Sequence, residues 1–200
     1  MPDYLAVDTD TLVVQAVAEG WRRAQVQAVG RYLRNCTDCE VHTIHQAGLK
    51  IWSIYETTPT YDSYFTEAQG RADAEKAIAQ AQALMVPSGK PIFFAVDYTP
   101  DAPHAPAIIK YFQAIMDTFR ESGNPYAVGV YGNYAVCWWL WNTEGLNNLL
   151  HYWQTTGNGS CGYVYPYADA LQIPTTCGNE ATLCGCSVDF DIILDPNILW

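Results

Sequence analysis

The chain has 200 residues, half of them hydrophobic and 16% charged, so it is long enough to fold around one substantial core and is unlike a disordered segment. Its net charge of −11 repels phosphate groups, and without a basic stripe this excludes nucleic acid as an expected partner. The longest apolar runs are too short to cross a bilayer, and no signal peptide is visible after Met1. We therefore expect one monomeric domain over residues 1–200 with no membrane span.

Strand-like and helix-like segments alternate along the chain. The clearest helix covers 70–86, where five apolar residues share one face: Ala74, Ala77, Ile78, Ala81 and Met85. Other amphipathic stretches cover 106–123 and 11–21, a helical or irregular stretch follows at 34–48, and a helical stretch runs through 137–141. Eight strands are predicted, at 4–9, 28–33, 49–56, 91–98, 127–132, 149–155, 168–174 and 187–194.

This alternation favours right-handed crossovers and a parallel sheet. Eight strands suit a closed α/β fold, the (β/α)8 TIM-like barrel, and the short chain requires some later crossovers to be short or non-helical. The alternative is a doubly wound open sheet, although no Gly-rich phosphate loop follows the first strand.

Acidic residues recur where the predicted strands end. Asp8 ends the first strand, Glu56 the third and Asp97 the fourth. The last strand carries Asp189 and Asp191, which share one face because successive residues of a strand alternate. In a barrel these ends form the floor of the active site. Asp10 and Asp101 are interpreted instead as helix caps or loop charges.

Carboxylates that converge among aromatic residues suggest glycoside hydrolysis. Seven Trp and fourteen Tyr residues can fill a core or stack on sugars. In this reaction one protonated carboxyl donates to the glycosidic oxygen, while a second stabilises charge or activates a nucleophile. No Ser-His-Asp spacing, HExxH motif or Walker loop competes, and the four scattered His residues are interpreted as surface or packing residues. We expect no metal and no cofactor.

The seven cysteines leave several interpretations open. Cys36-x-x-Cys39 could be a redox pair or half of a zinc site, but no second CxxC follows. Disulfides formed in an oxidising compartment are favoured, with free thiols and metal binding as alternatives. The predicted disulfide ties the Gly-rich loop that carries Cys177, Cys184 and Cys186, either within the loop or to Cys161.

Seven motifs occur in order along nearly the whole chain: YLAVDTDT, VGRYL, the helix beginning Gly70-Arg-Ala-Asp-Ala-Glu, KPIFFAVDYT, VGVYGNY, HYWQT and SVDFDIIL. Together they resemble the glycoside-hydrolase-like domain catalogued as domain-of-unknown-function family 1906. That family is related to the family 25 glycoside hydrolases, the (β/α)-barrel lysozymes that cut peptidoglycan.

The family 25 lysozymes carry an Asp on the first strand, an Asp-x-Glu on a middle strand and an Asp-x-Asn-like motif on the last. Asp8 matches the first position, and Asp189-Phe190-Asp191 matches the last. In the middle motif Asp97 stands in place of the acid Glu and Ala95 in place of the Asp. The resemblance implies a barrel that binds and cleaves an amino-sugar polymer, most plausibly peptidoglycan.

On this interpretation Asp97 is the general acid, Asp8 is its partner carboxylate and Asp189 tunes the charge. The residues expected to line the groove are Glu56, Tyr55, Tyr98, Tyr131, Trp153, Gln172 and Asp191. The departures at Ala95 and Asp97 support an alternative, a non-catalytic glycan-binding or cell-wall-targeting module on the same barrel. A structural domain of a larger secreted or phage-like assembly is a further alternative. In each case the expected location is secreted or in the cell envelope.

Overall fold

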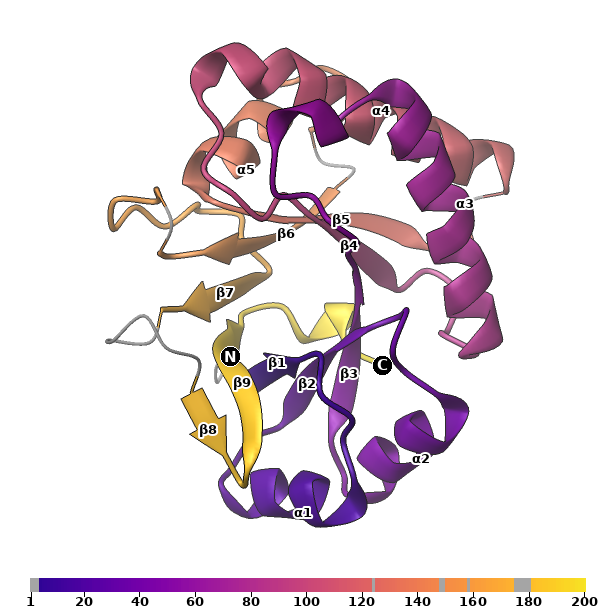
Figure 1. Cartoon of the computed structure of the whole chain (residues 1–200), viewed down its shortest axis with the longest axis vertical. Coiled ribbons are helices and arrows are strands. Elements are labelled where there is room, and N and C mark those ends of the chain that lie inside the picture. The colour runs from indigo at the N-terminus through magenta and orange to yellow at the C-terminus, as the bar shows by residue number, and fades with distance from the viewer. Residues whose placement is uncertain (1–3, 124, 148–149, 158, 175–180) are drawn as a thin grey trace.

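The computed structural model describes residues 4–123, 125–147, 150–157, 159–174 and 181–200. Eight strands close into a barrel, and a ninth, β8, pairs with the last of them (Figure 1). The strands are β1 (Tyr4–Thr9), β2 (Ala28–Tyr32), β3 (Lys50–Tyr55), β4 (Pro91–Ala95), β5 (Ala127–Gly132), β6 (Leu150–Thr155), β7 (Ala170–Ile173), β8 (Ala181–Leu183) and β9 (Cys186–Ile193). The predicted TIM-like barrel is confirmed.

The last strand runs against the others. Strands β1 to β7 are parallel, whereas β9 is antiparallel to both of its barrel neighbours, β7 and β1. The expectation of a fully parallel barrel is therefore wrong at this strand. A parallel strand needs a crossover back to the other end of the sheet. Here β8 and β9 instead form a hairpin, with Leu183 opposite Cys186, so β9 enters the barrel from the end at which β7 leaves it.

Five α-helices of the described residues surround the barrel: α1 (Gln15–Arg23), α2 (Asp38–Gln46), α3 (Glu67–Ala83), α4 (Ala105–Glu121) and α5 (Tyr134–Trp141). In Figure 1, α3, α4 and α5 lie on one side of the barrel, and α1 and α2 lie on the other. No α-helix follows β6 in the described part of the chain, as expected for the later crossovers. None of the described helices is both long and apolar enough to cross a membrane.

The helix predicted from 70–86 begins and ends three residues earlier. The Thr66 side chain accepts a hydrogen bond from the backbone N–H of Gln69 and caps the start of α3. Ala74, Ala77, Ile78 and Ala81 are buried on one face, as predicted. Met85 lies beyond the helix end with a φ of 54° and is 74% exposed, so its place in the predicted stripe is wrong.

Alternation along the strands fills the barrel with a few large rings and many small residues. The Trp153 ring packs edge to face against Trp52 and against Phe93, with ring centroids 5.7 Å and 6.1 Å apart respectively. Gly30 is required beside them because a Cβ there would lie 2.7 Å from the Trp52 ring. These buried rings fill the barrel below the strand ends.

The predicted disulfide is not formed among the cysteines that the structure describes. Cys161, Cys184 and Cys186 are free thiols, as are Cys36, Cys39 and Cys137, and Cys177 lies outside the described residues. Backbone pairing orders the hairpin instead, and the Trp21 indole on α1 donates to the carbonyl of Leu183 at 3.1 Å. Because this contact and the ladder position the turn, it does not depend on a covalent link.

Candidate functional site

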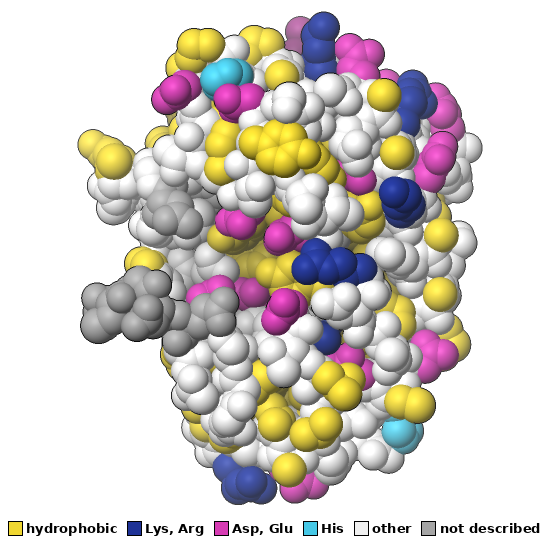
Figure 2. Space-filling view, in the orientation of Figure 1, with side chains coloured by type: hydrophobic (Ala, Val, Ile, Leu, Met, Phe, Trp, Pro, Cys, Tyr) yellow, Lys and Arg dark blue, Asp and Glu magenta, His cyan; other side chains and the backbone are white. Residues whose placement is uncertain are grey.

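Two adjoining pockets of about 150 and 200 Å³ form a hollow at the mouth of the barrel, and they share Tyr32, Glu56 and Asp189. Figure 2 shows acidic side chains gathered around this hollow, above a hydrophobic floor. The first pocket is also lined by Asp8, Thr9, Asp10, Arg34, Ser187 and Val188, and the second by Asp97, Tyr131, Trp153 and Gln172.

The alternation of strand residues explains why these side chains meet. Ala6, Ile54 and Ala95 face the barrel interior. Asp8, Glu56 and Asp97 each follow one of these residues by two positions, so their side chains point to the same side. Antiparallel pairing sets Asp189 of β9 directly opposite Asp8 of β1. Four separate strands therefore bring carboxyls to one mouth.

Asp8 is the most enclosed carboxyl that lines the hollow, at 3% exposure. The Tyr32 hydroxyl donates to its Oδ1 at 3.4 Å, and Gln172 Nε2 donates to its Oδ2 at 3.0 Å. The Tyr131 hydroxyl donates to Gln172 Oε1 at 2.6 Å, which fixes the amide with its NH₂ toward Asp8. Burial, followed by the negative charge of Asp189, raises the pKa of Asp8 to about 7, while the Gln172 hydrogen bond acts in the opposite direction.

Glu56 and Asp97 form a second acidic pair, at the ends of neighbouring strands β3 and β4. Burial and then the charge of Asp97 raise the pKa of Glu56 to about 7, against the opposing effect of the Arg34 guanidinium. The Asp97 side chain is exposed to solvent on one side. The residues around it partly desolvate its carboxyl, and this desolvation raises its pKa. The hollow thus holds carboxyls that are protonated in part near neutral pH.

Asp191 lies beneath the hollow and not on its surface. It is 0% exposed, and its Oδ1 accepts a hydrogen bond from the Trp153 indole at 2.8 Å. It does not line either pocket, where the sequence analysis expected it. Trp153 itself is 1% exposed and contributes only the floor of the second pocket.

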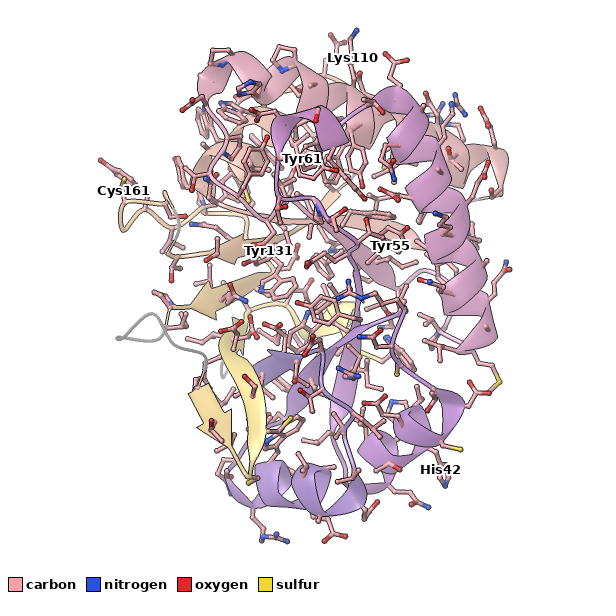
Figure 3. The ribbon with its side chains drawn as sticks, in the orientation of Figure 1. His42, Tyr55, Tyr61, Lys110, Tyr131 and Cys161 are labelled. Carbon is pink, nitrogen blue, oxygen red and sulfur yellow. The ribbon has the colours of Figure 1, made fainter. Side chains whose placement is uncertain are left out.

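Tyr55 and Tyr98 do not reach the hollow, contrary to prediction. Tyr55 lies on the α3 side of the barrel wall, apart from Tyr131 (Figure 3), and its hydroxyl donates to Asp73 Oδ1 at 2.9 Å. Tyr98 stacks on Phe65 with ring centroids 5.7 Å apart. Each tyrosine is adjacent in sequence to an inward-facing carboxyl, so the alternation of the strand turns it outward.

The pocket also contains residues that the sequence analysis did not assign to it. Tyr32 follows Gly30 by two residues, so the alternation in VGRYL was a usable signal for it, whereas Arg34 lies in the turn after β2. Asp10, interpreted as a cap or loop charge, is exposed at the first pocket, and α1 begins only at Gln15. No spacing rule pointed to Ser187 or Val188, because they enter through the unexpected direction of β9.

A buried ion pair supports the segment that carries Asp8 and Asp10. Arg31 Nε lies 2.9 Å from Glu40 Oε1, and both side chains are at most 1% exposed. Arg31 also donates to the carbonyl of Thr9, and Glu40 Oε1 accepts from the backbone N–H of Val13 at 2.8 Å. The pair thereby links β2 and α2 to both ends of the β1–α1 loop.

Within the described ranges, no group of three or more His, Cys, Asp and Glu side chains is arranged to hold a metal ion. The residues at the mouth are suited to binding hydroxyl and amide groups and to exchanging protons with them. The geometry therefore supports acid–base chemistry at this mouth of the barrel.

Known proteins resemble this chain over most of its length. A family model described as Rv2525c-like, glycoside hydrolase-like domain matches residues 19–183. The uncharacterised protein FadG of Bacillus subtilis is 31% identical over 203 residues, which cover 94% of this chain but only 35% of FadG. The crystal structure of the Tat-secreted protein Rv2525c of Mycobacterium tuberculosis matches with a TM-score of 0.80 and 23% identity, covering 96% of each chain. A bacterial lysozyme from Streptomyces coelicolor matches with a TM-score of 0.62 and 11% identity, covering 97% of this chain and 93% of its own. The two structures show a shared fold.

Proposed function

Because the chain belongs to the family of Rv2525c-like, glycoside hydrolase-like domains, we propose that its acidic mouth binds and hydrolyses an amino-sugar polymer, peptidoglycan. One observation carries the proposal: carboxyls from four barrel strands converge on one hollow, and two of them have a pKa of about 7. A lysozyme with the same barrel supports this choice of polymer. The Tat-secreted relative supports a site of action outside the cytoplasm.

The proposed acid comes from the Glu56–Asp97 pair. Glycoside hydrolysis needs a carboxyl that is protonated near neutral pH and can reach the glycosidic oxygen. Asp97 is the more exposed of the two, so it is assigned the delivery of the proton, as the sequence analysis expected. The raised pKa of Glu56 keeps the neighbouring Glu56 carboxyl partly protonated near neutral pH. In the reaction the glycosidic C–O bond breaks, and water supplies the hydroxyl to the sugar carbon and a proton back to the acid.

Asp8 is proposed as the partner carboxylate that stabilises positive charge on the sugar ring. Tyr32 and Gln172 hold it in place, and Asp189 beside it adds negative charge to the same region. Positive charge that develops on a sugar ring is stabilised by fixed negative groups in a partly dry pocket. Tyr32 and Tyr131 are proposed as the walls against which the sugar packs.

The test is the clearing of a suspension of purified cell walls by the protein and by the Asp97→Asn variant. The variant keeps the size of the side chain but has no proton to transfer, so we expect clearing to fall at least about 100-fold with the fold intact. Asp101→Asn, in the same loop but outside both pockets, is the matched control and should clear walls normally. An Asp97→Asn variant that clears walls as fast as the parent would remove Asp97 from the acid role.

A non-catalytic glycan-binding module is the second candidate function, and Ala95 is the observation that favours it. Ala95 is 2% exposed and faces the barrel interior, where the resemblance places a second middle-strand carboxylate. In a pull-down with insoluble cell walls, this module would bind without releasing reducing ends, and Asp97→Asn would bind as well as the parent. Release of reducing ends by the parent would exclude it.

A further inference from the structure

Asp8 and Asp191 are buried neighbours on the paired strands β1 and β9, where Ala6 faces Asp191 and Asp8 faces Asp189. Both side chains point into the barrel, two residues apart in the register. Two ionised carboxylates are both acceptors and repel each other, whereas a proton on one of them allows a hydrogen bond to the other. The geometry therefore favours a proton on one member of the pair.

The other hydrogen bonds decide which one carries it. Both oxygens of Asp8 already accept, from the Tyr32 hydroxyl and from Gln172 Nε2. Turning the amide would end the bond that Tyr131 donates to its Oε1 at 2.6 Å. A proton on Oδ2 of Asp8 would face the Gln172 NH₂, and a proton on Oδ1 would require the Tyr32 hydroxyl to give up its own bond to Asp8 and accept instead.

Asp191 has the complementary pattern. Its Oδ1 accepts from the Trp153 indole, whereas its buried Oδ2 receives no donor from the described residues. A fully buried carboxylate with a single donor is costly, but a carboxylic acid at the same place can donate from its second oxygen. Burial and the charge of Asp8 also raise the pKa of Asp191 well above its ordinary value.

We infer that Asp191 is a neutral carboxylic acid that donates a hydrogen bond to Asp8 and so acts as its positioning residue, leaving Asp8 as the ionised member of the pair. Asp8 then receives three donors, from Tyr32, Gln172 and Asp191. Hydrogen bonds from an acid to a carboxylate are short and strong, so this contact orients Asp8 toward the hollow. The role given to Asp8 rests on the proposed function, but the proton on Asp191 does not.

The surrounding charges favour the neutral acid. The other titratable groups around the pair are Asp189 on β9, Glu56 after β3, Tyr32 at the end of β2 and Tyr131 on β5. Arg34 is the one cation among the described residues lining either pocket, and it donates to the backbone carbonyl of Glu56. No cation in this set is placed to hold Asp191 as an anion.

Infrared spectroscopy tests the proton directly. At about pH 8.5, above the pKa of about 7 of Asp8 and Glu56, the parent should show the C=O stretch of one protonated carboxyl. Asp191→Asn should lose this band, and the control Asp38→Asn, at an exposed position on α2, should keep it. A band that persists in Asp191→Asn, or that is absent from the parent, overturns the inference.

A matched pair of variants tests which carboxyl holds the proton. Asn at 191 reproduces a neutral acid, since its NH₂ can donate to Asp8 while its oxygen accepts from Trp153. Asn at 8 removes the charge that accepts from Tyr32 and Gln172, and its NH₂ must face either the Gln172 NH₂ or a Tyr32 hydroxyl that no longer donates to it. We therefore expect Asp191→Asn to equal or exceed the parent in stability at pH 7, and Asp8→Asn to be less stable. The opposite order would place the proton on Asp8 and overturn the inference.

The pH dependence of unfolding gives a third readout that needs no hydrolysis. A proton held by Asp191 in the folded state and released in the unfolded state makes the parent less stable as pH rises above about 4. The ratio of the unfolding constants of parent and Asp191→Asn should grow by about tenfold per pH unit above that value. Parallel pH profiles for the two proteins would contradict a buried proton at this position.

Discussion

At the scale of single residues, Glu56 shows how a half-buried position turns a carboxyl into a pH-sensitive group. Its pKa is raised to about 7 in the folded protein, from an ordinary value of 4.5. Between these values the folded state binds more protons than the unfolded state, so the free energy of unfolding falls as pH rises. The destabilisation reaches its full size above pH 7 and vanishes below pH 4.5.

Glu56→Gln should therefore be more stable than the parent by about 1–2 kcal/mol at pH 8 and about equal to it at pH 4. Urea titrations at both pH values measure the difference. Glu67→Gln, on the exposed start of α3, serves as the control for replacing a surface carboxyl. A Glu56→Gln variant with the same pH profile as the parent would show that the pKa of Glu56 is not raised.

At the scale of elements, the Arg31–Glu40 pair is the main polar connection between the barrel and α2. Removing one partner of a buried pair leaves an uncompensated charge, so Glu40→Gln should lower the free energy of unfolding by about 3–5 kcal/mol. The exposed pair Arg71–Glu121, with its atoms 3.1 Å apart, is the control, and Glu121→Gln should cost less than about 1 kcal/mol. Denaturant unfolding of the two variants tests this. Similar losses of unfolding free energy would mean that the buried pair stabilises the fold no more than the exposed pair does.

Asp73 connects another set of elements through hydrogen bonds. It is fully buried in α3 and accepts from Tyr55 of β3, from Tyr64 and from Tyr111 of α4, at 2.6 to 2.9 Å. Tyr111→Phe removes one donor from a buried acceptor and should cost about 1–3 kcal/mol, measured by thermal or urea unfolding. Tyr163→Phe, at a hydroxyl on an exposed side chain, should cost almost nothing. If the two variants lost the same unfolding free energy, the hydrogen bonds to Asp73 would not stabilise the fold.

At the scale of the whole molecule, stability should not depend on redox conditions. The six described cysteines are free, and the ladder between β8 and β9 orders the hairpin that carries two of them. The melting temperature should therefore be the same with and without a reductant. Titration of denatured, unreduced protein should find at least six thiols. A marked fall in melting temperature on reduction would show that a disulfide contributes to folding after all.

The sequence by itself determined the barrel and the convergence of the acidic strand ends. Apolar strands alternate with amphipathic helices, and a carboxyl two positions beyond an inward Ala or Ile must face the mouth, so Asp8, Glu56 and Asp97 were predictable from local pattern. The same alternation could have predicted that Tyr55 and Tyr98 point outward and that Tyr32 points inward. Those errors came from assigning adjacent residues to one face.

Only the tertiary structure decided the direction of β9, the burial of Asp191 and the free state of the thiols. Each depends on pairing between segments far apart in the chain, and local periodicity carries no information about such pairing. Asp191 follows Asp189 on the same strand face, yet one lines the pockets and the other is enclosed beside Trp153. Their depth in the barrel separates them, and depth is set by the register of β9 against β1 and β7.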